Sequence, residues 1–461
     1  RDLDVMRERL GALRSPAAAA LHCGSETLSW EALAAAAGRQ AAAFCDVAPG
    51  TIVALAGRGR DLLMGLLAAH WRGHPFLPLD PDTADLRWPR LQAATGQPFW
   101  RIPALPAPLP NSIAPTTTAA EDAALVITTS GSEGLPKGVV LPHRALLAAA
   151  AASSTRIPLT NADTWLDCLP LTHIGGLAIF WRCFQAGAAV RLHERFSAEA
   201  VWADIRDGRA SHVSLVPAML AQMLDIAGKT PPPASLRCVL IGGAALSHQL
   251  WQRASAAGWP LYVSYGMSES AAQIATLTPS EDWHEGLVGT ALPSVELTID
   301  ADGRICLRGP QRMLGYLGEA PQDAGQWLTT GDLGRIDAAG RLTVIGRADD
   351  ILVSGGQNVH PADIEAQLTH CPGVDDAAVT GRCDPIWGDV LTALVVGSAG
   401  EDSVAAWCRT SLPSSLRPRQ ITEVIEQSIR PLVKARAREL AARGEADLVT
   451  EYFEPMSVEA L

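Results

Sequence analysis

The sequence predicts an α/β protein: a large N-terminal domain of helix-covered sheets with a small β-rich subdomain, followed by a smaller α+β C-terminal domain. Three observations lead to this prediction. The chain has 461 residues, more than one simple core organises, which indicates two or more domains. Apolar strand-like runs alternate with helical patterns in the first half, as in layered α/β proteins. Beyond residue 285 the pattern changes to short strands between glycine turns, and a new unit starts after Arg347.

The individual elements follow from apolar periodicity and from turn residues. We expect helices over 28–45 and 60–69, strands over 52–55 and 76–79, and a loop in the proline-rich stretch 103–115. Further strands are expected at 124–127, 188–192, 212–216, 238–241 and 261–263, with helices after Arg144 and from Ala198. The β-rich subdomain has strands at 295–299, 304–307 and 342–345, and the last unit has a helix over 361–369 and strands near 376–380 and 390–396. The predicted division is an N-terminal domain at 1–347 and a C-terminal domain at 351–461, joined by a linker at 348–350.

Composition excludes several classes of protein. Hydrophobic residues make up 48% and charged residues 19%, as in ordinary globular proteins. The net charge of −12 argues against nucleic acid as a partner. The nine cysteines are scattered, without a Cys-x-x-Cys pair, which favours reduced thiols in the cytoplasm over disulfides or a zinc site. No run of 18 apolar residues predicts a transmembrane helix, so we expect no membrane partner.

One segment, TTSGSEGLPKG at 128–138, has the chemistry of a phosphate-binding loop. Backbone N–H groups and small hydroxyls in such loops approach phosphate oxygens closely, and Lys137 adds a point charge. It is not a Walker A loop, because Pro136 and Gly138 flank the lysine and prevent a direct run into a helix.

This segment resembles the phosphate-binding motif of the adenylate-forming acyl-CoA and aryl-CoA ligases, usually written TSGTTGxPKG. Four further segments are similar to motifs of that family: LPLTHIGG at 169–176, YGMSES at 265–270, TGDLG at 330–334 and GRADDILVSGGQNVHP at 346–361. The motifs cover about 120–440, and the chain most resembles o-succinylbenzoate–CoA ligase and benzoate-type CoA ligases. The resemblance implies ATP, Mg²⁺ and CoA as ligands and a carboxylic acid as substrate.

The resemblance also implies a nucleotide site. It places the ring of Tyr265 against adenine, the hydroxyl of Ser268 on the α-phosphate, and Glu269 on Mg²⁺, a hard cation that prefers carboxylate oxygen. Asp332 would hold the ribose hydroxyls with help from Arg347. The other ATP- or AMP-binding residues implied are Thr129, Ser130, Gly131, Ser132, Gly134, Gly243, Ala244, Gly266 and Met267.

The remaining implied roles belong to catalysis and to the thiol. Lys434 would bridge the acyl carboxylate and the α-phosphate, acting with Lys137, Ser268 and Glu269 as catalytic residues. His173 would line the acyl pocket, where we expect Gly175 and Gly176 to leave room for a flat aromatic acid. The resemblance further implies that the linker 348–350 is a hinge centred on Asp349, about which the C-terminal domain is mobile. It also implies a CoA channel at Gly355, Gly356 and Trp387.

Two positions depart from the family pattern. Glu133 stands where Thr is usual, and a carboxylate about 4 Å from a phosphate would cost on the order of 4 kcal/mol at an effective dielectric of 20. We therefore expect Glu133 to turn away or to pair with a cation such as Lys137 or Mg²⁺. Val433 stands where Gly is usual in the loop that carries Lys434.

Three alternatives remain open at this point. The thiol acceptor is either CoA or the phosphopantetheine of an acyl carrier protein. An amino acid substrate is disfavoured, because no aspartate accompanies His173 in the pocket loop to hold an α-ammonium. A non-catalytic nucleotide-binding protein on the same fold is the third, supported only by Glu133 and Val433. Pattern alone does not identify the acid, and it leaves open a monomer or a homodimer.

Overall fold

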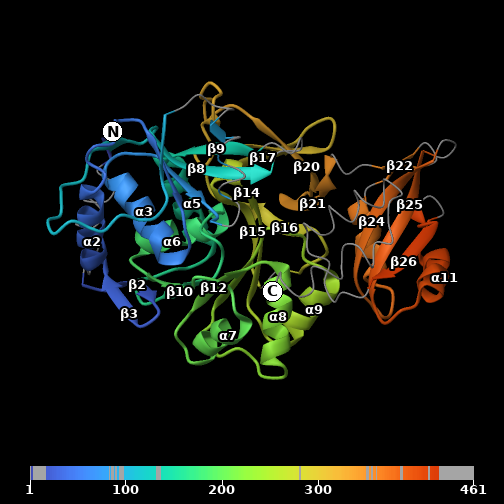
Figure 1. Ribbon diagram of the computed structural model, residues 1–461. Helices are drawn as coiled ribbons and strands as arrows, with labels where there is room; N and C mark the ends of the chain where they lie inside the picture. The colour runs from blue at the N-terminus through green and yellow to red at the C-terminus, as the bar shows by residue number, and fades with distance from the viewer. Residues whose placement is uncertain are drawn as a thin grey trace.

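The computed structural model describes residues 2–3, 17–81, 84, 88, 91–92, 98–130, 136–279, 282–348, 352–354, 357–359, 361–384, 388–413 and 416–424. Two large sheets and their helices occupy most of the molecule, and a smaller five-stranded sheet with its helices lies at one end (Figure 1). This arrangement confirms the predicted fold class.

The largest sheet has 13 strands in the order β17-β18-β20-β21-β16-β15-β14-β13-β12-β10-β11-β2-β3. Its parallel half consists of β2 (Ala19–Cys23), β10 (Thr164–Asp167), β11 (Ala189–Leu192), β12 (His212–Leu215), β13 (Cys238–Ile241) and β14 (Leu261–Met267). Its antiparallel strands are β3 (Glu26–Ser29), β15 (Ala272–Leu277), β16 (Leu287–Ala291), β17 (Glu296–Ile299), β18 (Arg304–Arg308), β20 (Leu328–Ile336) and β21 (Arg341–Arg347). The predicted β-rich stretch therefore extends the same sheet that carries the parallel strands.

The second sheet has six strands in the order β19-β9-β8-β5-β4-β6. Its members are β4 (Ile52–Ala56), β5 (Phe76–Leu79), β6 (Phe99–Ile102), β8 (Ala123–Ser130), β9 (Pro136–Pro142) and β19 (Gly315–Tyr316). The short strands β1 (Asp2–Leu3) and β7 (Thr118–Ala119) pair separately. Strands β4 and β5 are buried along their length, which explains why they read as uninterrupted apolar runs.

Helices fill the space between the two large sheets and cover the outer face of the larger one. The main core combines strands of both sheets with α2 (Trp30–Ala42), α3 (Gly59–Trp71), α5 (His143–Arg156) and α6 (Ile174–Ala186). A second core joins β12 to β14 with α7 (Ala198–Arg206), α8 (Pro217–Ala227) and α9 (His248–Ala256). Helices α2, α7 and α9 each begin after a serine whose hydroxyl accepts a backbone N–H of the first turn, a standard N-cap.

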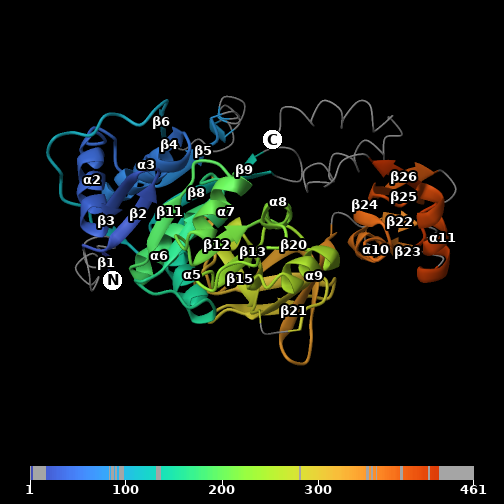
Figure 2. The same ribbon diagram turned by 90° about the horizontal axis from the view of Figure 1, so that it is seen from below.

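The five-stranded sheet forms the C-terminal unit, which lies beyond α9 (Figure 2). It contains β22 (Leu352–Ser354), β23 (Gln357–Val359), β24 (Val374–Asp384), β25 (Gly388–Gly397) and β26 (Gln420–Val424), with helices α10 (Pro361–Leu368) and α11 (Glu401–Ser411). It has a hydrophobic core of its own. Helix α9 meets this unit through Gln249, whose Nε2 lies 3.3 Å from Oδ1 of Asp375, and through a ring contact between His248 and His370.

The helices in the described part of the chain include none that combines the length and the apolar character needed to span a bilayer.

Candidate active site

Motifs that are far apart in the sequence meet at the carboxyl ends of the parallel strands, where open α/β sheets bind ligands. Tyr265 lies at the end of β14, and its hydroxyl donates a hydrogen bond of 2.6 Å to Oδ2 of Asp332 in β20. Strands β15, β16 and β21 separate β14 from β20 in the sheet. The contact therefore requires the sheet to curl strongly, so that two of the predicted nucleotide motifs come together.

Asp332 and Arg347 form the second part of this arrangement. They are cross-strand partners in β20 and β21, and Nη1 of Arg347 lies 3.7 Å from Oδ1 of Asp332. A side chain at Gly331 would place its Cβ 2.8 Å from Nη2 of Arg347, so it would move the Arg347 guanidinium from its place beside Asp332. Burial, reinforced by the Asp332 carboxylate, raises the pKa of Tyr265, which keeps its phenol protonated as a donor. Asp332 stays 19% exposed, so its carboxylate remains accessible to hydroxyl donors.

Glycines and a strained turn shape the ends of β13 and β14. Gly243 has a φ of +80°, a conformation that glycine adopts without strain. A Cβ at Gly266 would collide with the backbone of Ala272 in the neighbouring strand, at a β-bulge. After a single 3₁₀ turn, η1 (Ser268–Ser270), Ala271 and Ala272 have φ values of +51° and +89°. Positive φ at alanine is costly and is concentrated at functional turns, and this turn carries Ser268 and Glu269.

Glu269 and Lys137 approach the same residue, Tyr316 of β19. The hydroxyl of Tyr316 donates to Oε1 of Glu269 at 3.0 Å, and Nζ of Lys137 lies 5.1 Å from the centroid of the Tyr316 ring. Sequence reasoning missed Tyr316, because it belongs to a strand of only two residues, too short to leave a periodic pattern. The structure thus joins the phosphate-loop lysine to the predicted metal-binding carboxylate through an uncharged aromatic residue.

The single carboxylate of Glu269 suits a magnesium ion whose other ligands are mainly phosphate oxygens. Mg²⁺ usually takes one or two protein carboxylates and completes its shell with water and substrate phosphate oxygens. Among the described residues, no cluster of three or more His, Cys, Asp or Glu could hold a metal by itself. A single carboxylate with one oxygen bonded to Tyr316 is compatible with a metal that arrives with ATP.

The two described ends of the predicted phosphate-binding segment are paired antiparallel strands, not loop. Thr129 of β8 is the cross-strand partner of Lys137 in β9, so both ends of the predicted loop continue the six-stranded sheet. Strand β8 includes the small hydroxyl residues at the start of this segment, because such residues fit a pleated strand as well as a loop. The implied binding residues Gly131, Ser132 and Gly134, together with Glu133, lie outside the described residues.

The predicted acid pocket begins at His173, which is exposed and immediately precedes α6. A Cβ at Gly175 would meet only Leu169, at 3.6 Å. At Gly176 it would lie 2.8 Å from the carbonyl oxygen of Pro170. The expectation that both glycines leave room for substrate is therefore wrong for Gly176, because close packing of the helix start against the preceding loop already requires glycine there.

Arg182, two turns further along α6, is a charged residue that the sequence analysis did not single out. It is 4% exposed, its guanidinium carbon lies 5.1 Å from the centre of the Trp165 ring, and its Nη1 atom has no hydrogen-bond partner among the described residues. Burial lowers the pKa of Arg182 to about 10, so it is still charged at neutral pH. Its neighbour Asp167 is buried, and burial raises the pKa of that carboxyl well above its usual value. A lone arginine in the apolar run 174–184 was the signal available in the sequence.

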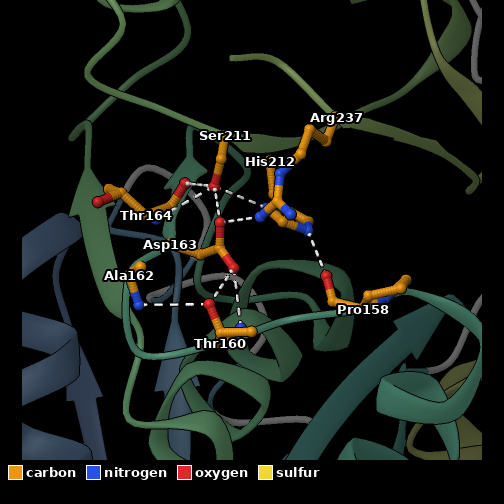
Figure 3. A network of polar contacts seen from close by, with 8 residues as sticks. All are labelled: Pro158, Thr160, Ala162, Asp163, Thr164, Ser211, His212 and Arg237. Carbon is orange, nitrogen blue, oxygen red and sulfur yellow. Dashed lines mark hydrogen bonds and ion pairs between the residues drawn. The ribbon is translucent and has the colours of Figure 1, made fainter. Parts of the chain in front are cut away.

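A serine, a histidine and an aspartate also lie together at the opposite end of the sheet (Figure 3). They are not arranged to activate the serine as a nucleophile. Ser211 donates to Oδ1 of Asp163 at 2.9 Å and contacts Nδ1 of His212 at 2.8 Å. The other ring nitrogen of His212 contacts the Pro158 carbonyl at 3.0 Å, and Arg237 pairs with Asp163. In a hydrolytic triad the aspartate orients the histidine, whereas here it accepts from the serine. The network ties together the starts of β10, β12 and β13.

Several predicted residues remain untested. Lys434, the hinge residue Asp349 and the CoA-channel residues Gly355, Gly356 and Trp387 lie outside the described residues. The side chain of Ser130 is likewise not described. Their roles stay predictions.

Comparison with known protein families gives two matches. The family model for AMP-binding enzymes matches residues 86–317, and the model for the C-terminal domain of AMP-binding enzymes matches residues 363–431. Among curated relatives, the 2-succinylbenzoate–CoA ligase of Bacillus cereus is 34% identical over 341 residues, which cover 69% of this chain and 70% of the relative. The ligase of the same name from Listeria monocytogenes is 37% identical over 309 residues, 66% of each chain.

Solved structures give the same picture. The o-succinylbenzoate CoA synthetase of Bacillus subtilis in complex with ATP and magnesium has a TM-score of 0.81 and 28% identity, over 91% of this chain and 95% of that one. ATP-bound MatB from Rhodopseudomonas palustris has a TM-score of 0.86, over 96% and 99% of the two chains; at 24% identity it shows the fold alone. With both matches in the order that the family shares, and with relatives above 30% identity over most of their length, the chain belongs to the family of AMP-binding enzymes.

Proposed function

We propose that this protein is an AMP-forming acid–thiol ligase. It activates an aryl carboxylic acid, similar to o-succinylbenzoate or benzoate, as an acyl-adenylate and then transfers the acyl group to CoA. The observation that carries the proposal is the hydrogen bond between Tyr265 and Asp332, because it brings adenine-binding and ribose-binding motifs together although three strands separate them. The names of the relatives and the presence of both family domains support the same activity.

The first half-reaction joins the acid to AMP. A carboxylate oxygen attacks the α-phosphorus of ATP, the bond from that phosphorus to the bridging oxygen breaks, and pyrophosphate leaves. Negative charge spreads over the phosphate oxygens during the transfer, and its stabilisation is the main catalytic task. Lys137 and Ser268 supply donors to those oxygens, and Lys434 is proposed to bridge the carboxylate and the α-phosphate. Bound Mg²⁺, held through Glu269, would neutralise phosphate charge.

The second half-reaction moves the acyl group to a thiol. The thiol of CoA releases its proton to solvent and its sulfur attacks the acyl carbonyl carbon. The bond from that carbon to the phosphate oxygen breaks, so the thioester forms and AMP leaves. We propose that the C-terminal unit first rotates about Asp349 and that the thiol enters past Gly355 and Gly356, near Trp387. The separate hydrophobic core of that unit supports its movement as one body.

The nature of the acid follows from the buried arginine of α6. An o-succinylbenzoate-type acid has two carboxylates, and only one of them reacts with ATP. The second needs a cation in an otherwise apolar pocket, because an unpaired buried anion is costly. Arg182 lies on the helix that begins directly after His173, and its Nη1 atom has no hydrogen-bond partner among the described residues, so we propose that it pairs with the non-reacting carboxylate.

One experiment tests the proposal. Acid-dependent exchange of radioactive pyrophosphate into ATP is measured over a panel of aryl, aliphatic and amino acids, followed by thioester formation with CoA or with a phosphopantetheinyl carrier protein. Exchange with aryl acids and thioester formation on CoA are expected. Transfer to the carrier protein alone would favour the loading enzyme, and no exchange with any acid would favour a non-catalytic nucleotide-binding protein.

Cytoplasmic location is part of the proposal, supported by the eight described cysteines, all unpaired.

A further inference from the structure

We propose that Tyr316 is a positioning residue that holds Lys137 and Glu269 apart, each in place for its own part of magnesium-bound ATP. This inference rests on the proposed function, since it assigns Lys137 to phosphate and Glu269 to the metal. It concerns a residue outside all the motifs that the sequence analysis used.

The backbone around Tyr316 connects the two motifs directly. The N–H of Met313 donates to the carbonyl of Glu269 at 2.9 Å. Four residues later, the N–H of Leu317 donates to the carbonyl of Gly138 at 2.7 Å, next to Lys137. Residues 313–317 are thus bonded at one end to the metal-binding turn and at the other to strand β9 of the phosphate-binding segment.

The packing of residues 313–317 against β9 restricts the position of Tyr316. Tyr316 is the cross-strand partner of Val139 in β9, which fixes its position relative to Lys137. A Cβ at Gly138 would lie 3.0 Å from Cβ of Leu317, so the two strands approach as closely as glycine allows. Tyr316 is therefore held at a set distance from both neighbours by the sheet.

The side chain of Tyr316 satisfies both charged groups without adding charge. Its hydroxyl donates to the Glu269 carboxylate, and the face of its ring lies under the Lys137 ammonium, an arrangement with cation–π attraction. Burial first, and then the Glu269 charge, raises the pKa of Tyr316, so the phenol keeps its proton at neutral pH. Hydrogen bonds to a carboxylate are stronger than those between neutral groups.

An uncharged residue at this place has a clear advantage over direct pairing. If Lys137 and Glu269 formed an ion pair, phosphate and Mg²⁺ would each have to break it, because one binds the cation and the other the anion. With Tyr316 between them, the ligands displace only a ring contact and leave the phenol bonded to Glu269. The carboxylate then keeps one oxygen on Tyr316 and offers the other to the metal.

The test measures ATP binding without any acid, so it does not depend on the substrate. Tryptophan fluorescence or calorimetry follows binding of ATP as Mg²⁺ is titrated, for wild type, Tyr316→Phe, Tyr316→Leu and the control Tyr262→Phe. Tyr262 is a partly buried tyrosine of β14 that packs against the same hydrophobic core as Tyr316. Tyr316→Phe keeps the ring, and we expect it to raise the Mg²⁺ concentration for half-maximal binding about tenfold, the effect of one hydrogen bond to a charged group. Tyr316→Leu should also weaken ATP binding without Mg²⁺.

Two further measurements separate positioning from folding and from the proposed function. Thermal unfolding of Tyr316→Phe should match wild type within about 3 °C, since the change is nearly isosteric. In the background of Glu269→Gln, Tyr316→Phe should have no further effect on Mg²⁺ dependence. Equal Mg²⁺ dependence of Tyr316→Phe and wild type, with ATP binding intact, would overturn the inference alone. Failure of wild type to bind ATP at any Mg²⁺ concentration would overturn the proposed function as well.

Discussion

The imidazole rings of His248 and His370 lie 5.0 Å apart, and they join helix α9 to the end of α10 in the C-terminal unit. His248 also stacks on Trp283, 6.0 Å away, with Trp251 completing the aromatic group. Gln249 and Asp375 add one polar contact beside the rings. This small contact between the two parts of the molecule includes the imidazole of His248, and a histidine ring in a contact of this kind can respond to pH.

Acid should therefore weaken the docking of the C-terminal unit. Burial first, and then His370, lowers the pKa of His248 in the docked arrangement, so docking favours the neutral ring. Its contribution is complete above the ordinary histidine pKa of about 6.5 and is lost as the pH falls through that value. Small-angle scattering should change between pH 7.5 and 5.5 for wild type and much less for His248→Gln, which has no titrating ring at this position. A profile that is the same at both pH values in wild type would contradict this.

Removing the carboxylate of Asp332 should weaken nucleotide binding while leaving the fold intact. Asp332→Asn loses charged acceptors for ribose hydroxyls, so we expect the KM for ATP to rise about 10- to 100-fold, as for hydrogen bonds to charged groups. Tyr265→Phe should have a smaller effect. Asp337→Asn is a matched control, because Asp337 follows β20 directly and its side chain bonds to Arg341 and to the Ala339 N–H in a surface turn. Equal effects of the two asparagine variants would show that Asp332 stabilises the β20–β21 hairpin and does not contact ATP.

Arg182 should discriminate between acids. In Arg182→Met, we expect the KM for o-succinylbenzoate to rise about 100-fold, the order of a broken buried charge pair, while the KM for ATP stays unchanged. Benzoate has no second carboxylate and serves as the internal control, with little change expected. Exchange kinetics with both acids give the measurement. Parallel losses for both acids would assign Arg182 to packing against Trp165 instead.

Stability should fall in acid because two histidines are buried in neutral form. His70 contacts the Ala124 carbonyl at 2.7 Å, and its ring lies 5.0 Å from that of His143. Burial lowers the pKa of His70 to about 3 and that of His143 to about 4. Unfolded histidine binds a proton near pH 6.5, so stability is highest above that value and is lost as the pH falls below it.

At pH 5 each histidine should lower the free energy of unfolding by about 2 kcal/mol relative to neutral pH. Urea unfolding of wild type and His70→Gln at pH 7.5 and 5.0 measures this. The variant should lose about half as much stability between the two values as wild type does. An equal loss in both proteins would mean that other groups cause the acid sensitivity.

Lys434 should act in only one half-reaction. Lys434→Ala is expected to abolish pyrophosphate exchange, by at least about 100-fold, and to leave thioester formation from supplied acyl-adenylate nearly unchanged, because its charge serves only the transfer of the α-phosphate. Loss of both half-reactions in Lys434→Ala would show that its role is placed wrongly.

The hinge variant Asp349→Pro, which restricts φ, should have the reverse effect: it should form and accumulate acyl-adenylate but lose thioester formation.

Local patterns were sufficient for the buried strands. The predicted strands at 76–79 and 238–241 coincide with β5 and β13, since each is a short apolar run bounded by turn residues. The predicted helix at 28–45 starts two residues late, at Trp30, because Leu28 and Ser29 finish the edge strand β3. Motif resemblance named Tyr265 and Asp332, but not their direct contact. That contact depends on the curvature of a whole sheet, and Tyr316 depends on a strand of two residues, neither of which leaves a local signal.

The curl that brings Tyr265 to Asp332 makes the ribose site sensitive to strands that never touch ATP. Gly289 of β16, one of the three strands in between, has a φ of +82°, and a side chain there would press on the backbone of Thr276 in β15. A larger residue at that point would force the backbones of β15 and β16 to shift and would so disturb the placement of the phenol relative to the carboxylate. A substitution in the intervening strands can therefore change nucleotide affinity by altering their backbone geometry, although every side chain that contacts the ligand stays the same.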